Sequence, residues 1–166
     1  MSAEREPPVA IDLVVEAGAW AGEDALAALA GRAVSASFAE ARLAAVAGSE
    51  LSLLFTDDAH IRVLNGAWRS KDMATNVLSF PGSPPKAGRF GPLLGDIVIA
   101  EETVRAEAAA EGIAFEDHLM HLMVHGLLHL FGHDHMQDDE AERMEALETA
   151  ILGRLGIADP YADRAS

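Results

Sequence analysis

FEDHLMHLMVHGLLHLFGHDH, at residues 115–135, is an apolar run that carries six of the chain's seven histidines at short intervals. Its hydrophobic residues recur at helical spacing, which predicts a core helix over residues 115–131. Gly132 follows where a residue in the left-handed conformation commonly ends a helix. His125 and His129 are four residues apart, so they lie about 6 Å apart on one face of this helix.

His125, His129 and His135 have the spacing of three metal ligands. Two imidazoles one helical turn apart can converge on one ion, and a turn at Gly132 allows His135 to supply a third nitrogen. Three protein ligands leave one position of a tetrahedral zinc open, as in catalytic zinc sites. We therefore predict one Zn²⁺ per chain, although nickel, copper or iron would accept the same nitrogens.

These histidines stand at offsets zero, four and ten with a glycine at offset seven, which is the spacing of the metzincin metalloproteases. In those enzymes offset one is a glutamate that serves as general base. Here it is Gly126, which cannot take a proton from water. Either another group does so, or the chemistry is not that of a protease.

Further motifs flank the histidines. RSKDMATNVLSFP at residues 69–81 and LLGDIVIA at residues 93–100 precede HGLLHLFGHDH, and DDEAERMEALETAIL at residues 138–152 follows it. From Leu51 to Tyr161, these motifs resemble the YbeY family of bacterial endoribonucleases. The resemblance implies a small mixed sheet flanked by helices.

The resemblance also implies a function: a zinc-dependent, single-strand-specific endoribonuclease in maturation of ribosomal RNA, particularly small-subunit RNA, and in ribosome quality control. Arg69 falls on the arginine implicated in the family's nuclease activity. A guanidinium suits this role, because its planar fork of donors matches a phosphate and stays charged. The expected partners are an rRNA precursor and the ribosome or ribosome-associated proteins, with no DNA and no membrane.

Composition sets the outer limits. The chain has 166 residues, half of them hydrophobic, and no cysteine. We expect one domain, residues 1–166, with a single core and no disulfide or thiolate site. The N-terminus does not have the pattern of a signal peptide, and no uncharged apolar run is long enough to span a bilayer. A cytoplasmic protein is therefore expected.

The net charge of -15 opposes binding to a polyanion. The charge is unevenly distributed, however. Residues 59–95 carry five basic residues against one acidic, a net charge of +4, whereas residues 101–166 carry four against fifteen, a net charge of -11. A nucleic acid should therefore approach over the first of these segments.

The whole pattern predicts an α+β fold of about four strands packed with helices, with the metal site at the end of a core helix. A strand, a long helix and a second strand at the N-terminus favour a parallel pair with a crossover. Arg69 is expected in a loop after a short helix that ends at Asn65-Gly66. The expected strands are residues 9–15, 51–55, 76–80 and 93–100, and the expected helices are residues 23–48, 56–66, 101–111, 115–131 and 140–155.

Other polar residues are expected to have supporting or structural roles. Asp134 and Asp138 are close enough in sequence to orient an imidazole. Asp138 also belongs to a group of acidic residues that favour a solvated helix start, together with Asp139, Glu140, Glu142 and Glu145. His121 shares the face of His125, but the motif is complete without it. His133 is expected to point elsewhere. Lys71 could add positive charge for binding, and Asn76 and Ser79 suit structural hydrogen bonds.

Two other functions remain open. A metalloprotease is suggested by the histidine spacing and opposed by Gly126. A non-catalytic ribosome-associated protein with a structural zinc would be favoured by a fourth protein ligand. Trp20, Trp68 and Tyr161 are too scattered in the sequence to indicate a base-stacking platform.

Overall fold

The computed structural model describes residues 9–133 and 137–161, and this part has the predicted α+β fold. Its strands are β1 (Ala10–Val15), β2 (Glu50–Thr56), β3 (Val77–Pro81) and β4 (Leu93–Ala100), and its helices are α1 (Glu23–Ala41), α2 (Asp58–Arg69), α3 (Glu101–Glu111), α4 (Phe115–Leu130) and α5 (Asp138–Arg154). None of these helices is both long and apolar enough to span a membrane.

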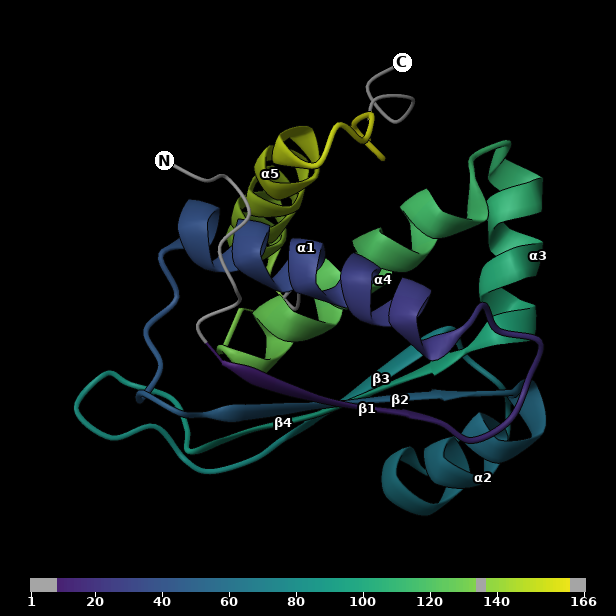
Figure 1. The fold of residues 1–166 in the computed structure, drawn as a ribbon, viewed down its shortest axis with the longest axis horizontal. Helices are drawn as coiled ribbons and strands as arrows, with labels where there is room; N and C mark the ends of the chain where they lie inside the picture. The colour runs from purple at the N-terminus through teal and green to yellow at the C-terminus, as the bar shows by residue number, and fades with distance from the viewer. Residues whose placement is uncertain (1–8, 134–136, 162–166) are drawn as a thin grey trace.

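The four strands form one mixed sheet in the order β1-β2-β4-β3. β1, β2 and β4 are parallel, and β3 pairs antiparallel with β4 at one edge. Figure 1 shows α1, α4 and α5 on one side of the sheet and α2 on the other. The parallel pair of β1 and β2 joined through α1 confirms the predicted crossover.

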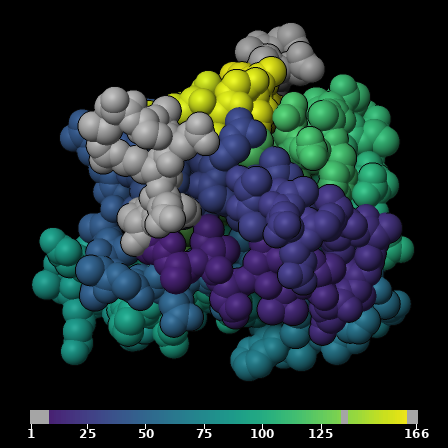
Figure 2. Space-filling model, in the orientation of Figure 1, coloured from purple at the N-terminus to yellow at the C-terminus, as the bar shows by residue number. Residues whose placement is uncertain are grey.

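Side chains that alternate along the strands divide the core between the two sides of the sheet. In β4, Ile97 and Ile99 belong to the large cluster with α1, α4 and α5, whereas Val98 and Ala100 pack in a smaller cluster with Ile61 of α2. On the face shown in Figure 2, the side chains of α1 fill the space between β1 and the yellow α5. The helix that carries the histidines therefore lies in the middle of the helical layer, in contact with both α1 and the sheet.

Two helices end at other residues than predicted. α1 ends at Ala41 rather than near Gly48, because Arg42 takes the left-handed conformation with φ 53°. α2 continues past Gly66 to Arg69 and is capped by Ser70, whose N–H donates to the carbonyl of Asn65. The prediction that Arg69 lies in a loop was therefore wrong: it belongs to the last turn of a helix, which gives its backbone a fixed position.

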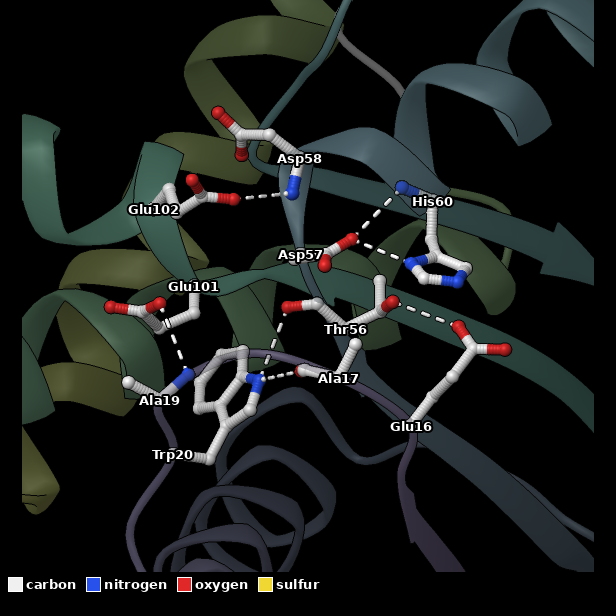
Figure 3. A network of polar contacts seen from close by, with 10 residues as sticks. All are labelled: Glu16, Ala17, Ala19, Trp20, Thr56, Asp57, Asp58, His60, Glu101 and Glu102. Atoms are coloured by element: carbon white, nitrogen blue, oxygen red, sulfur yellow. Dashed lines mark hydrogen bonds and ion pairs between the residues drawn. The ribbon is translucent and has the colours of Figure 1, made fainter.

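The carboxyl ends of the parallel strands are closed by a polar network (Figure 3). The indole Nε1 of Trp20 lies 2.9 Å from the carbonyl of Ala17 and 3.1 Å from that of Thr56. Thr56 Oγ1 also donates to Glu16 at 2.8 Å. Ligands of open parallel sheets commonly bind at this end, but here the chain's own side chains occupy it, and the histidines of α4 lie elsewhere.

Candidate metal and phosphate site

Three histidines of α4 are partly exposed in a stretch of the helix that is otherwise buried. From His118 to Leu130 every residue is buried except His121, His125 and His129, which are spaced by four and are partly exposed. Four residues is close to one helical turn, so these three side chains form one stripe along α4. The imidazole rings of His125 and His129 have centroids 4.7 Å apart.

Glu148 of α5 joins two of these histidines through one carboxylate. Its Oε1 lies 2.8 Å from His121 Nε2, and its Oε2 lies 2.7 Å from His125 Nδ1. The hydroxyl of Tyr161, beyond α5, also donates to Oε1. Only 1% of Glu148 is exposed, so this carboxylate depends on these donors in place of water.

The donors keep Glu148 ionised. Burial alone would raise the pKa of the Glu148 carboxyl, because it disfavours the charged form. The hydrogen bonds from the two histidines and the tyrosine, together with the charge of His125, outweigh burial and lower this pKa to about 2. Because an ionised carboxylate only accepts hydrogen bonds, the histidine nitrogens that face it must carry protons.

This arrangement fits a metal ion. With Nδ1 of His125 held by Glu148, Nε2 is the nitrogen through which His125 would bind, and the neighbouring ring of His129 comes from the next turn of the same helix. A carboxylate behind a metal-binding imidazole is the usual support of such a ligand. The third predicted ligand, His135, lies outside the described residues, and within them no group of three or more candidate ligands is brought together.

Gly126 explains how closely α4 approaches the sheet. A Cβ atom at this position would lie 3.0 Å from Ser79 Oγ and 3.1 Å from Ile97 Cγ2. Ser79 Oγ in turn donates to the carbonyl of Gly126 at 3.2 Å. A glutamate here would be directed into the sheet, so the position of the metzincin general base does not face the cleft.

Ser79 also connects the histidine helix to Arg69. While its hydroxyl contacts α4, its carbonyl accepts a hydrogen bond from Arg69 Nη2 at 2.7 Å. The Arg69 guanidinium further lies 5.5 Å from the ring centroid of Phe80. One residue of the edge strand β3 thus fixes both the arginine and the helix that carries His125 and His129.

Arg69, Lys71, His121, His125 and His129 all line one cleft of about 1510 Å³. This volume exceeds the range of roughly 300 to 1,000 Å³ that is typical of small-molecule pockets. The cleft follows the edge strand β3, between the loop after α2 and the segment after α5. Its size and its open course along the sheet edge suit part of a polymer.

The end of the cleft near α3 holds a second polar cluster. His118 Nε2 lies 2.8 Å from Glu107 Oε1, and Asn76 Nδ2 donates to the same oxygen at 3.0 Å. The side-chain oxygen of Asn76 also accepts from the N–H of Val77. These contacts confirm the predicted structural role of Asn76, while the hydroxyl contact of Ser79 does the same for that residue.

The support of the histidines differs from the prediction. Asp138 begins α5 as an exposed residue, Asp134 lies outside the described residues, and the carboxylate that holds His125 is Glu148. A signal for it was present in the sequence. Glu148 stands four residues after Met144 and three before Ile151, both buried, so a charged side chain occupies the apolar face of α5. His133 is absent from the residues that line the cleft, as expected.

A comparison with protein families identifies the chain. The family model described as endoribonuclease YbeY matches residues 19–156. The chain belongs to this family. Among its relatives, the endoribonuclease YbeY of Rhizobium meliloti is 54% identical over 160 residues, which cover 93% of this chain and 95% of the relative. That of Agrobacterium fabrum is also 54% identical, covering 92% and 94% of the two chains.

The fold also has a counterpart among solved structures. The solution structure of TM1509 from Thermotoga maritima superposes with a TM-score of 0.55 over 90% of this chain and 97% of that one. The two sequences are only 22% identical, so this likeness concerns the fold alone. Family membership accounts for the shared motifs that flank the histidines of α4.

Replacement of Glu148 by glutamine should lower the free energy of unfolding of the zinc-free protein, by an amount that depends on pH. Because the pKa of Glu148 falls from 4.5 to about 2 on folding, its ionisation stabilises the fold fully above pH 4.5. This contribution, about 3 kcal/mol, is lost as the pH falls from 4.5 to 2. Urea unfolding at pH 7 should therefore show a large loss for Glu148→Gln, and the two proteins should converge near pH 2.

Glu142→Gln is the matched control, since Glu142 is an exposed carboxylate on the same helix. Its free energy of unfolding should stay within about 0.5 kcal/mol of the wild-type value. A loss for Glu148→Gln that is the same at pH 7 and at pH 2 would show that the carboxylate charge is not what stabilises the site.

Proposed function

We propose that this chain is a zinc-dependent endoribonuclease that hydrolyses single-stranded ribosomal RNA. One Zn²⁺ would be bound by His125, His129 and His135, and Arg69 would bind the scissile phosphate. The substrate would be a precursor of small-subunit rRNA in the cytoplasm, with the ribosome or ribosome-associated proteins as partners. Its role would be rRNA maturation and ribosome quality control.

The observation that carries this proposal is that Arg69 and the histidine pair line the same cleft. Ser79 contacts both Arg69 and the backbone of α4 beside His125, so the guanidinium and the imidazoles are held at one place along β3. A phosphodiester needs a cationic donor for its oxygens and an activated water for attack, and these two groups suit those needs. Membership of a family of endoribonucleases supports RNA as the substrate.

In this mechanism the protein's own residues position the reaction. Glu148 fixes the orientation of His125 through Nδ1. Bound at the histidines, zinc would supply a Lewis acid that activates water at neutral pH. Arg69 would hold the phosphate and stabilise the negative charge that increases on its oxygens in the transition state. The hydrogen bond to Ser79 restricts the guanidinium before substrate binds.

The protease alternative is disfavoured by the packing at Gly126. A Cβ atom at this position would meet Ser79 Oγ at 3.0 Å and Ile97 at 3.1 Å, so a glutamate would not fit here unless these neighbours moved. The zinc-loaded chain should be incubated side by side with single-stranded RNA, duplex RNA, single-stranded DNA and an unfolded protein. We expect cleavage of the single-stranded RNA alone; cleavage of the protein but not of RNA would refute the proposal.

Arg69→Ala and His129→Ala should distinguish the phosphate-binding role of Arg69 from the metal-binding role of His129. Arg69→Ala should lower kcat/KM for RNA cleavage by about 10²-fold or more while the zinc content remains at one per chain, because the arginine acts on the phosphate alone. His129→Ala should lose both zinc and activity. Zinc content would be measured by mass spectrometry and cleavage by gel electrophoresis of a labelled RNA.

Arg62→Ala is the control for the loss of a positive charge. Arg62 belongs to the same helix as Arg69 but is paired with Asp72, with Nε 2.7 Å from the carboxylate. Its replacement should leave cleavage within about twofold of wild type. Full activity of Arg69→Ala would exclude the phosphate role, and a fully metallated, active His129→Ala would exclude His129 as a ligand.

A further inference from the structure

Trp68 is the most exposed large hydrophobic side chain among the described residues, at 70%. It stands seven residues after Ile61 on α2, which places the two on nearly the same helix face. Ile61 is fully buried against the sheet, whereas the indole of Trp68 is open to solvent. An indole this exposed contributes much less to the core than the buried side chain of Ile61, so its apolar surface is available to a ligand.

The exposed indole is part of a surface that we call the Trp68 surface, formed by Trp68, Phe80 and Arg69. The rings of Trp68 and Phe80 have centroids 6.2 Å apart in an edge-to-face arrangement. The Arg69 guanidinium lies over the Phe80 ring, 5.5 Å from its centroid. Contact with Phe80, from the edge strand β3, restricts the indole and reduces the entropy lost when a ligand stacks on it.

The Trp68 surface adjoins the cleft at Arg69, which carries its positive charge. Arg69 lines the cleft and contacts the surface, and Lys71 follows two residues later on the cleft wall. Neither cation forms an ion pair with a carboxylate among the described residues, whereas Arg62 on the same helix is paired with Asp72. Uncompensated positive charge beside an exposed aromatic ring is the combination that binds single-stranded nucleic acid.

We propose that Trp68 stacks on an unpaired base of the RNA next to the phosphate held by Arg69. This inference rests on the proposed function, since it assigns a binding site to the same substrate. Only a single strand can turn a base face toward the indole while its backbone follows Arg69 and Lys71. The Trp68 surface would therefore contribute to selection of single strands over duplexes.

The chain provides its own probe, because it has only two tryptophans. The indole nitrogen of Trp20 donates to two backbone carbonyls inside the fold. Stopped-flow mixing of the zinc-loaded protein with a single-stranded oligoribonucleotide should quench tryptophan fluorescence before turnover, and Trp68→Phe should remove this quench. The same oligonucleotide as a duplex should quench weakly.

Steady-state kinetics should then separate stacking from chemistry. Trp68→Ala should raise KM for single-stranded RNA about tenfold with kcat within about twofold of wild type, and Trp68→Phe should restore most of the loss. Val63→Ala is the matched control, since Val63 is 69% exposed on the same helix. It should change neither constant.

The outcomes distinguish the two proposals. If the wild type cleaves RNA but Trp68→Ala has an unchanged KM and the wild type shows no quench, the stacking site is wrong and the nuclease remains. If the wild type neither binds nor cleaves RNA, both are wrong. If the wild type is a dimer that Trp68→Ala dissociates without a change in KM, the surface binds a second copy of the chain, and the stacking site is likewise excluded.

Discussion

The buried carboxylate of Glu148 is the constraint on which the site depends. It accepts hydrogen bonds from His121 and His125 of α4 and from Tyr161 beyond α5. A carboxylate that is 1% exposed is costly to bury unless donors surround it, so these three side chains must be in place whenever α5 is packed. The hydrogen bonds that compensate for the burial of Glu148 also orient His125, so the packing of α5 and the orientation of this histidine occur together.

The place of the site follows from two features of the sheet. At the carboxyl ends of the parallel strands, the side chains of Trp20, Thr56 and Glu16 are engaged in hydrogen bonds within the fold. At the β3 edge, Gly126 lets α4 approach β3 and β4 closely, and Ser79 joins that helix to Arg69. The resulting cleft lies along the sheet edge. Arg69 at the end of α2 and Lys71 in the loop after it lie on its wall, although the chain carries a net charge of -15.

The sequence predicted the elements well because they depend on local patterns. Alternating residues located the strands, and the apolar run of residues 115–131 located α4 with its last residue at Leu130. The predicted end of α2 was wrong. The helix ends where Ser70 takes the left-handed conformation and where Asn65 donates a hydrogen bond to the carbonyl of Met73, and neither feature has a strong local signal in the sequence. The glycine that follows α4 was recognised, and Gly132 has φ 89° as expected.

The site was predictable only in part. The spacing of His125 and His129 predicted their common face, but the support of His125 comes from Glu148, 23 residues later, and such a contact has no signature in spacing. Its charged side chain on the apolar face of α5 was the available clue. Trp68 was judged too isolated in sequence, and only the fold brings Phe80 and Arg69 beside it. His135 lies outside the described residues and stays a prediction.

The most direct test of the account is the tautomer of His125 in the zinc-loaded protein. Long-range ¹H–¹⁵N NMR of histidine-labelled protein distinguishes a protonated ring nitrogen from one bound to a metal. If Glu148 organises the site, Nδ1 of His125 carries the proton and Nε2 binds the metal. Coordination through Nδ1, or a signal that does not change when zinc is added, would contradict the account.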